Sequence, residues 1–181
     1  MKQGRIIIIT GSPGTGKTTV ASIVAQKSDM EKSVHMHTDD FYHYLSKGGI
    51  PPHLPESNEQ NVVVIEAFLE AAKRFVYGGY DVIVDGIVGP WFLTPWRNII
   101  QEGYEVHYII LRASKEMTLK RAVERSKLDR NTNIELVETM WKQFHSLNEC
   151  ERYVLETTDL SVNETVLLVR ETICKKSNLL V

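Results

Sequence analysis

The sequence has few cysteines, no excess of charge of either sign and no long hydrophobic run. Cys150 and Cys174 are its only two cysteines, too few for the disulfide framework of a small secreted domain. The 21 lysines and arginines nearly balance the 23 aspartates and glutamates, and the formal net charge of −2 gives no general attraction to nucleic acid or acidic lipid. Apolar runs stop well short of the ~20 residues that cross a bilayer, and no secretory cleavage site follows Ile6–Ile9. We therefore expect a cytoplasmic protein with no membrane association.

Length and composition predict one folded domain. A chain of 181 residues corresponds to about one domain of ordinary size. Its 43% hydrophobic and 24% charged residues are typical of a globular protein rather than a disordered one. We expect residues 1–181 to form a single domain.

Short apolar segments alternate along the chain with segments of helical periodicity. The short segments are rich in β-branched residues and bounded by polar residues or glycine, which is typical of strands. Five strands are predicted, at Arg5–Thr10, Val34–Thr38, Tyr80–Asp85, Val106–Leu111 and Tyr153–Glu156. Several are apolar at nearly every position, as in parallel strands covered on both faces. The alternation predicts an α/β fold with a parallel sheet between two layers of helices. Only Lys47–Asn61, with three prolines and two glycines, lacks any period and is predicted to be a loop.

The segment after the first strand matches the pattern G-x-x-x-x-G-K-[ST]. This phosphate loop precedes a predicted helix, which is the context that the motif requires. It consists of Gly11, Ser12, Pro13, Gly14, Thr15, Gly16, Lys17 and Thr18, with Thr19 next to it. Glycines let main-chain N–H groups wrap around a polyphosphate, Lys17 can reach the outer phosphates, and the Thr18 hydroxyl can ligate Mg²⁺. We expect binding of ATP with Mg²⁺; the alternative is a glycine-rich turn that only links strand to helix.

Three carboxylates follow predicted strands at the edge where open parallel sheets bind ligands. Asp39 and Asp40 come directly after the second strand, where one of them can accept the proton of a substrate hydroxyl; the alternative is a cap for the following turn. Asp85 ends the third strand, and either holds Mg²⁺ or contacts the substrate, or only forms a turn with Gly86.

Basic residues gather after the fourth strand. Arg121 and Arg125 lie four residues apart, on one face of a predicted helix, and can neutralise charge on a transferred phosphoryl group. The alternative is a solvated face paired with acidic neighbours such as Glu124. Arg97 either anchors an anionic acceptor or begins an exposed helix.

Two histidines alternate within the second strand. His35 and His37 share a face of that strand, with Asp39 next in phase. This pattern has two interpretations, a transition-metal site and a strand that lines a polar crevice.

Together, the phosphate loop, the Asp39-Asp40 pair, Asp85-Gly86 and the arginine-rich segment before Met140-Trp141 resemble the small P-loop kinases. This group contains gluconate kinase, shikimate kinase, chloramphenicol phosphotransferase, zeta toxin and polynucleotide 5′-kinase domains. The resemblance implies a three-layer P-loop NTPase fold with sheet order 2-3-1-4-5. It also implies an acceptor-side insert at 41–61 and a lid-like segment at 115–135.

The resemblance also implies a base, but leaves two positions for it. Asp39-Asp40-Phe41 is similar to the Asp-Ser-Phe of chloramphenicol phosphotransferase and uridine kinase, which favours Asp39. The Asp-Phe-Leu-His of gluconate kinase would instead place Asp40 in that role. The proline-rich loop departs from gluconate kinase, and the adjacent carboxylates depart from the Asp-x-Asp of shikimate kinase.

The expected function is transfer of the γ-phosphate of ATP·Mg²⁺ to a hydroxyl of a small molecule, such as a sugar acid, a related metabolite or an antibiotic. Lys17, Asp39, Arg121 and Arg125 are the expected catalytic residues. Asp40, Asp85 and Arg97 are expected to bind substrate, and Thr18 and Asp85 to hold the metal. We expect a monomer or homodimer. The alternatives are a nucleic-acid 5′-hydroxyl kinase, which the net charge weighs against, and a regulatory ATPase without acceptor chemistry.

Overall fold

A computed structural model describes residues 4–126 and 134–181. It contains a five-stranded sheet in the order β2-β3-β1-β4-β5, in which every pair of neighbours is parallel. The strands are β1 (Arg5–Thr10), β2 (Ser33–His37), β3 (Asp81–Asp85), β4 (Val106–Arg112) and β5 (Val154–Glu156). The predicted fold class and the order 2-3-1-4-5 are confirmed.

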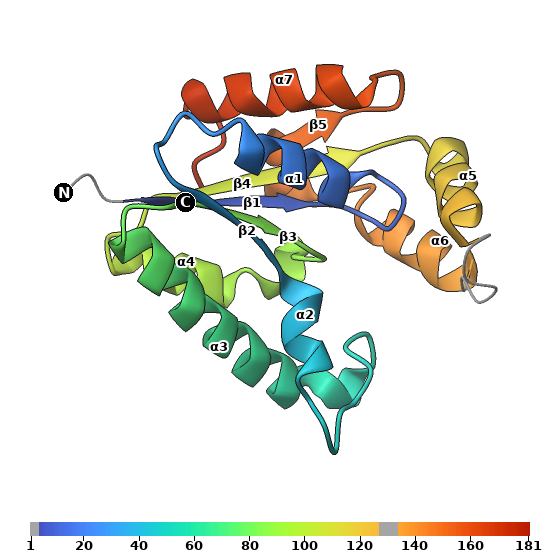
Figure 1. The fold of residues 1–181 in the computed structure, drawn as a ribbon. Helices are drawn as coiled ribbons and strands as arrows, with labels where there is room; N and C mark the ends of the chain where they lie inside the picture. Colours follow the sequence, from blue (N-terminus) through green and yellow to red (C-terminus); the bar gives the residue numbers. More distant parts are fainter. Residues whose placement is uncertain (1–3, 127–133) are drawn as a thin grey trace.

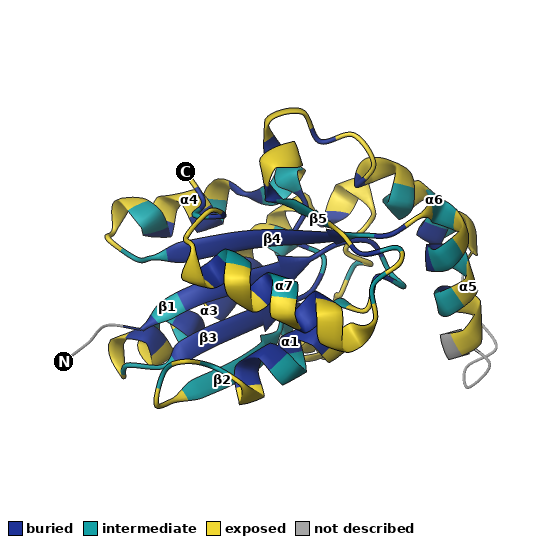
Figure 2. Ribbon diagram, turned by 90° about the horizontal axis from the view of Figure 1, so that it is seen from above, coloured by how far each residue is buried: buried dark blue, intermediate teal, exposed yellow. Residues whose placement is uncertain are grey.

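Helices cover both faces of this sheet (Figure 1). One layer consists of α1 (Lys17–Gln26) and α7 (Val162–Cys174), and the other of α3 (Asn58–Tyr77) and α4 (Thr94–Gln101). The isoleucines of β1 alternate between the two layers: Ile7 and Ile9 pack with α1 and α7, and Ile6 and Ile8 with α3 and α4. All four are fully buried, and Figure 2 shows the central strands buried along their length. Apolar area removed from water on both faces, at about 25 cal/mol per Å², holds the three layers together.

Each predicted strand is present, with ends shifted by one residue where a local hydrogen bond intervenes. The second strand ends at His37, not Thr38, because the His37 ring accepts the Asp39 N–H and caps a short helix, α2 (Thr38–His43). The third begins at Asp81, because the N–H of Tyr80 donates to the Phe75 carbonyl in the turn that ends α3.

The predicted loop Lys47–Asn61 is too long at its end. A single 3₁₀ turn at Pro55–Ser57 leads into α3, which already begins at Asn58. The first turn of α3 lacks an apolar face because its side chains bind the loop: the Gln60 amide makes two 2.7 Å hydrogen bonds with the main chain of Ile50. Apolar periodicity, the signal used for the helix, starts only where α3 packs on the sheet.

Two further helices, α5 (Lys115–Ser126) and α6 (Ile134–Gln143), lie beyond the carboxyl ends of the strands (Figure 1). The connection between them, residues 127–133, lies outside the described residues. The assignment of 115–135 as a lid, like that of 41–61 as an acceptor-side insert, stays a prediction. Among the described helices, none has the length and apolar character needed to cross a membrane.

Candidate active site

The phosphate loop connects β1 to α1 at the carboxyl edge of the sheet. Gly14 and Gly16 take left-handed φ angles of +88° and +85°, and the Thr15 hydroxyl donates to the Ser12 carbonyl at 2.9 Å. Gly16 is the N-cap of α1 and has no side chain to cap with, so the first-turn N–H groups of α1 can bind an anion. Lys17 and Thr18 begin that helix, half-buried, at the same place. Close packing fixes the loop from the other side, because the Thr118 carbonyl of α5 would lie 2.4 Å from a Cβ on Gly14.

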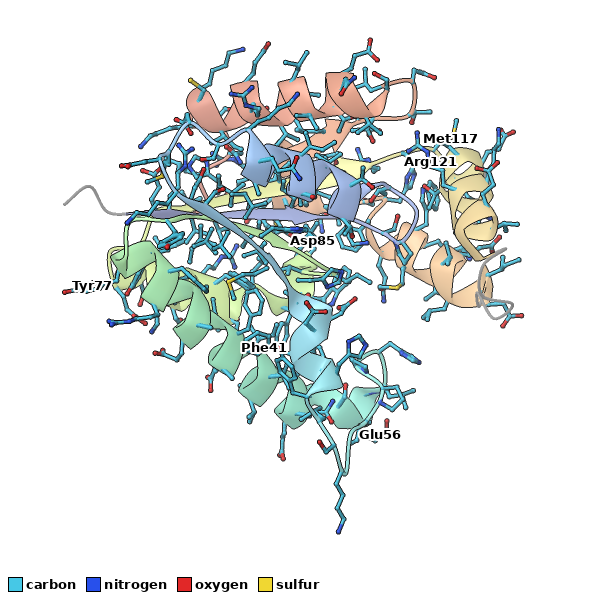
Figure 3. The ribbon with its side chains drawn as sticks, in the orientation of Figure 1. Phe41, Glu56, Tyr77, Asp85, Met117 and Arg121 are labelled. Atoms are coloured by element: carbon cyan, nitrogen blue, oxygen red, sulfur yellow. The ribbon has the colours of Figure 1, made fainter. Side chains whose placement is uncertain are left out.

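Asp85 lies at the end of β3 with its side chain fully buried (Figure 3). Its Oδ1 is 2.7 Å from Nε2 of His35, and its Oδ2 is 3.6 Å from Nε2 of His37. Burial works to raise the pKa of Asp85, but hydrogen bonds from His35 and Thr18 hold the pKa below its ordinary value. Asp85 is therefore a carboxylate at neutral pH.

The residues around Asp85 fit a bound Mg²⁺. Within the part of the chain that the structure describes, Asp85 Oδ2 is buried without a hydrogen-bond partner. A buried acceptor without a hydrogen bond costs free energy, and a bound cation would offset that cost. Carboxylate and hydroxyl oxygens are the ligands that Mg²⁺ prefers, and Thr18 supplies a hydroxyl next to Asp85. The histidines do not form a separate metal site: the described residues include no group of three or more His, Cys, Asp or Glu side chains that could hold an ion.

Gly86 lets β3 turn directly past α2. Its φ is +151°, and a Cβ there would lie 1.8 Å from Oγ1 of Thr38. We expect Gly86→Ala to lower the free energy of unfolding by about 2–5 kcal/mol, because strain and steric overlap add. Gly103→Ala is the matched control, since Gly103 also has a positive φ (+93°) but nothing within 4 Å. Urea denaturation of both variants measures the difference, and equal losses would contradict this account.

Asp39 and Asp40 occupy the first turn of α2, at the carboxyl end of β2. Asp39 Oδ2 is 3.9 Å from Nδ1 of His37, whose Nε2 faces Asp85. Adjacent helical residues point about 100° apart, so Asp40 cannot face the same direction as Asp39. Burial, with the charge of Asp39, raises the pKa of Tyr42 to about 12, which keeps the Tyr42 phenol neutral. Both carboxylates are exposed to solvent.

The structure separates Arg97 from Arg121. Arg121 is half-buried one turn beyond Thr118, on the side of α5 that faces the phosphate loop (Figure 3). Arg125 belongs to the same helix, but its side chain lies outside the described residues. Arg97 lies away from Arg121. Its Nε donates to the carbonyl of Val181, and the neighbouring Leu180 N–H donates to Val106, the first residue of β4, at the opposite end of the sheet.

Two contacts at this site are not predictable from the sequence. The hydrogen bond between His35 and Asp85 joins residues 50 apart in the chain, and only the pairing of β2 with β3 brings them together. The alternation of His35 and His37 was the available signal, but it does not identify the neighbouring strand. Likewise, the contact of Thr118 with Gly14 depends on where α5 packs.

The sequence is similar to a known protein family and to known kinases. A family model described as AAA domain matches residues 7–142. The cytidylate kinase of Pyrobaculum calidifontis is 26% identical over 191 residues, covering 96% of this chain and 95% of that protein.

Two solved structures show a similar fold. A gluconokinase from Sinorhizobium meliloti 1021 superposes with a TM-score of 0.66 and 16% identity, over 98% of this chain and 95% of that one. In a structure of the Pnkp1/Rnl/Hen1 RNA repair complex, the match has a TM-score of 0.63 and 20% identity, and spans 82% of this chain but only 46% of that one. At these identities the likeness is one of fold.

Proposed function

Since the chain belongs to the AAA domain family and is a phosphotransferase of the P-loop kinase type, we propose that it transfers the γ-phosphate of ATP to a hydroxyl group of a small molecule. These relatives confirm the resemblance to P-loop kinases that the phosphate loop, the two acidic motifs and the arginine-rich segment indicated. The observation that carries the proposal is the position of Asp39. This carboxylate lies 3.9 Å from Nδ1 of His37, and Nε2 of the same ring lies 3.6 Å from the buried Asp85.

The phosphate loop holds ATP in this proposal. Its N–H groups and the Lys17 ammonium bind the phosphates, while Thr18 and Asp85 hold Mg²⁺ directly or through water. When bound, the metal ion neutralises charge on the β- and γ-phosphates. Arg121, which α5 presents beside the loop, adds positive charge where the γ-phosphoryl group is transferred.

Asp39 acts on the acceptor. Its carboxylate accepts the proton of the substrate hydroxyl as that oxygen forms a bond to the γ-phosphorus. The bond between the γ-phosphorus and the β–γ bridging oxygen breaks, and ADP leaves with the electron pair. Asp40 and the exposed residues of the 41–61 insert contact the rest of the acceptor. Arg97, bound to the C-terminal residue, has no part in this proposal.

A second candidate acceptor is a nucleoside monophosphate, which the cytidylate kinase relatives favour. Its phosphate oxygens are already ionised near neutral pH, so that reaction needs no general base. A hydroxyl, by contrast, must lose its proton, which is the role proposed for Asp39. We therefore favour the hydroxyl acceptor.

The test is an acceptor panel with purified protein and Mg²⁺·ATP, monitored by ADP release and by mass spectrometry of the acceptor. The panel contains sugar acids, sugars, nucleosides, aminoglycoside and phenicol antibiotics, nucleoside monophosphates and a 5′-hydroxyl oligonucleotide. We expect phosphorylation of a small hydroxyl compound. Turnover of cytidine monophosphate alone would favour the second candidate. Phosphorylation of the oligonucleotide alone, or ATP hydrolysis with no acceptor dependence, would each overturn the proposal.

A further inference from the structure

Two imidazoles from one edge strand flank the buried carboxylate at the metal-binding end of the site. In the parallel pairing of β2 with β3, His37 stands opposite Asp85 and His35 opposite Ile83. Both imidazoles therefore lie on the same face of the sheet as the Asp85 side chain. The Asp85 side chain is fully buried, while those of His35 and His37 keep 25% and 27% exposure.

His35 fixes one oxygen of Asp85. The 2.7 Å contact between His35 Nε2 and Asp85 Oδ1 is a charge-assisted hydrogen bond in which the imidazole donates. A carboxylate held by one oxygen has a restricted orientation, and here Oδ2 is the oxygen without a hydrogen-bond partner among the described residues. His35 thus determines which oxygen is available to a ligand.

His37 joins Asp85 to the acceptor side of the site. Its Nδ1 accepts the N–H of Asp39 at 3.1 Å as the N-cap of α2, so Nδ1 carries no proton in this contact. The ring proton is then on Nε2, the nitrogen 3.6 Å from Asp85 Oδ2. One ring therefore sets the start of the helix that carries Asp39 and lies beside the carboxylate of Asp85.

We propose that His35 and His37 are positioning residues: His35 orients Asp85 toward Mg²⁺, and His37 sets the place of Asp39 relative to that carboxylate. The inference rests on the proposed function, since it assigns roles around the same metal and base. Removing partners that orient a metal ligand typically costs 10- to 100-fold in metal affinity. The opposing interpretation is that both histidines only make the edge strand polar.

His35 is tested through ATP binding rather than turnover. The dissociation constant of ATP is measured by calorimetry with Mg²⁺ and with a chelator, at one pH, for the wild type, His35→Leu and His35→Gln. We expect His35→Leu to reduce the Mg²⁺-dependent gain in affinity about tenfold and to leave metal-free binding unchanged. His35→Gln keeps an N–H at the reach of Nε2, so it should restore most of that gain. If both variants keep the wild-type Mg²⁺-dependent gain in ATP affinity, the role of His35 is wrong. Equal losses of that gain in the two variants would also overturn it.

Two substitutions test the cap that His37 provides to α2. His37→Asn keeps an acceptor at the position of Nδ1 and therefore the cap of α2, so we expect it to keep most of the wild-type kcat/KM for the acceptor. His37→Gln keeps a donor at the reach of Nε2 but loses the cap, so we expect about a fivefold loss of kcat/KM for the acceptor and a wild-type Mg²⁺ gain. Identical behaviour of the two variants would overturn the role of His37.

Failure of the inference is distinct from failure of the proposed function. If wild-type protein phosphorylates a hydroxyl but the histidine variants match it in every measurement, only the positioning roles are wrong. If wild-type protein binds Mg²⁺·ATP and phosphorylates no hydroxyl, the proposed function is wrong while the calorimetric test of His35 still stands. Thermal unfolding midpoints within a few degrees of the wild type confirm that each variant is folded.

Discussion

Replacing Lys17 with alanine is expected to lower kcat/KM for ATP about a thousandfold. Lys17 begins α1 directly after the left-handed Gly16, so its ammonium belongs to the same anion site as the first-turn N–H groups. Loss of one preorganised charge that faces a developing negative charge costs about 10² to 10³ in kcat, and weaker ground-state binding adds to that loss. Steady-state kinetics at saturating acceptor measures the change.

The control for Lys17 is Lys27→Ala, which removes the same charge just after the C-terminal end of α1. We expect that variant to have wild-type kinetics, because the helix separates Lys27 from the phosphate loop by about 15 Å at 1.5 Å per residue. If Lys17→Ala stays within threefold of the wild type, the phosphate loop does not hold the transferred phosphate and the kinase mechanism loses its basis.

Asp39→Asn is expected to lower kcat by about 10² to 10⁴, the usual contribution of a general base. The amide keeps the size of the side chain and leaves the main-chain N–H that His37 accepts, so α2 should keep its position. The KM for ATP should therefore change little. Steady-state kinetics with varied ATP and varied acceptor separates the two effects.

Asp40→Asn is the matched control, because it makes the same change of charge on the next residue of the same helix. We expect it to alter the KM of the acceptor by a few fold and kcat hardly at all. A large loss of kcat in Asp40→Asn alone would make Asp40 the base, as the gluconate kinase pattern implies. If neither variant loses kcat, the reaction needs no carboxylate base, which would favour an acceptor that is already ionised.

The sequence by itself determined the local features of this protein. The phosphate loop is a continuous motif, and strand and helix periods follow from side chains that alternate every 2 or 3.6 residues. The capping box of Ser161 and Glu164 at the start of α7 is another such feature, because it depends on four consecutive residues. The sheet order came from the resemblance to P-loop kinases, since periodicity says which face is buried and not which strand lies next to which.

Only the tertiary structure decided how distant residues meet. The order β2-β3-β1 brings His35 against Asp85, although neither residue carries any local sign of the other. The same packing places α5 against Gly14 and directs Arg97 to the C-terminal Val181 instead of the site. The physical reason is that contacts between strands and between layers depend on crossover connections and on the burial of whole faces, which no short segment of the sequence records.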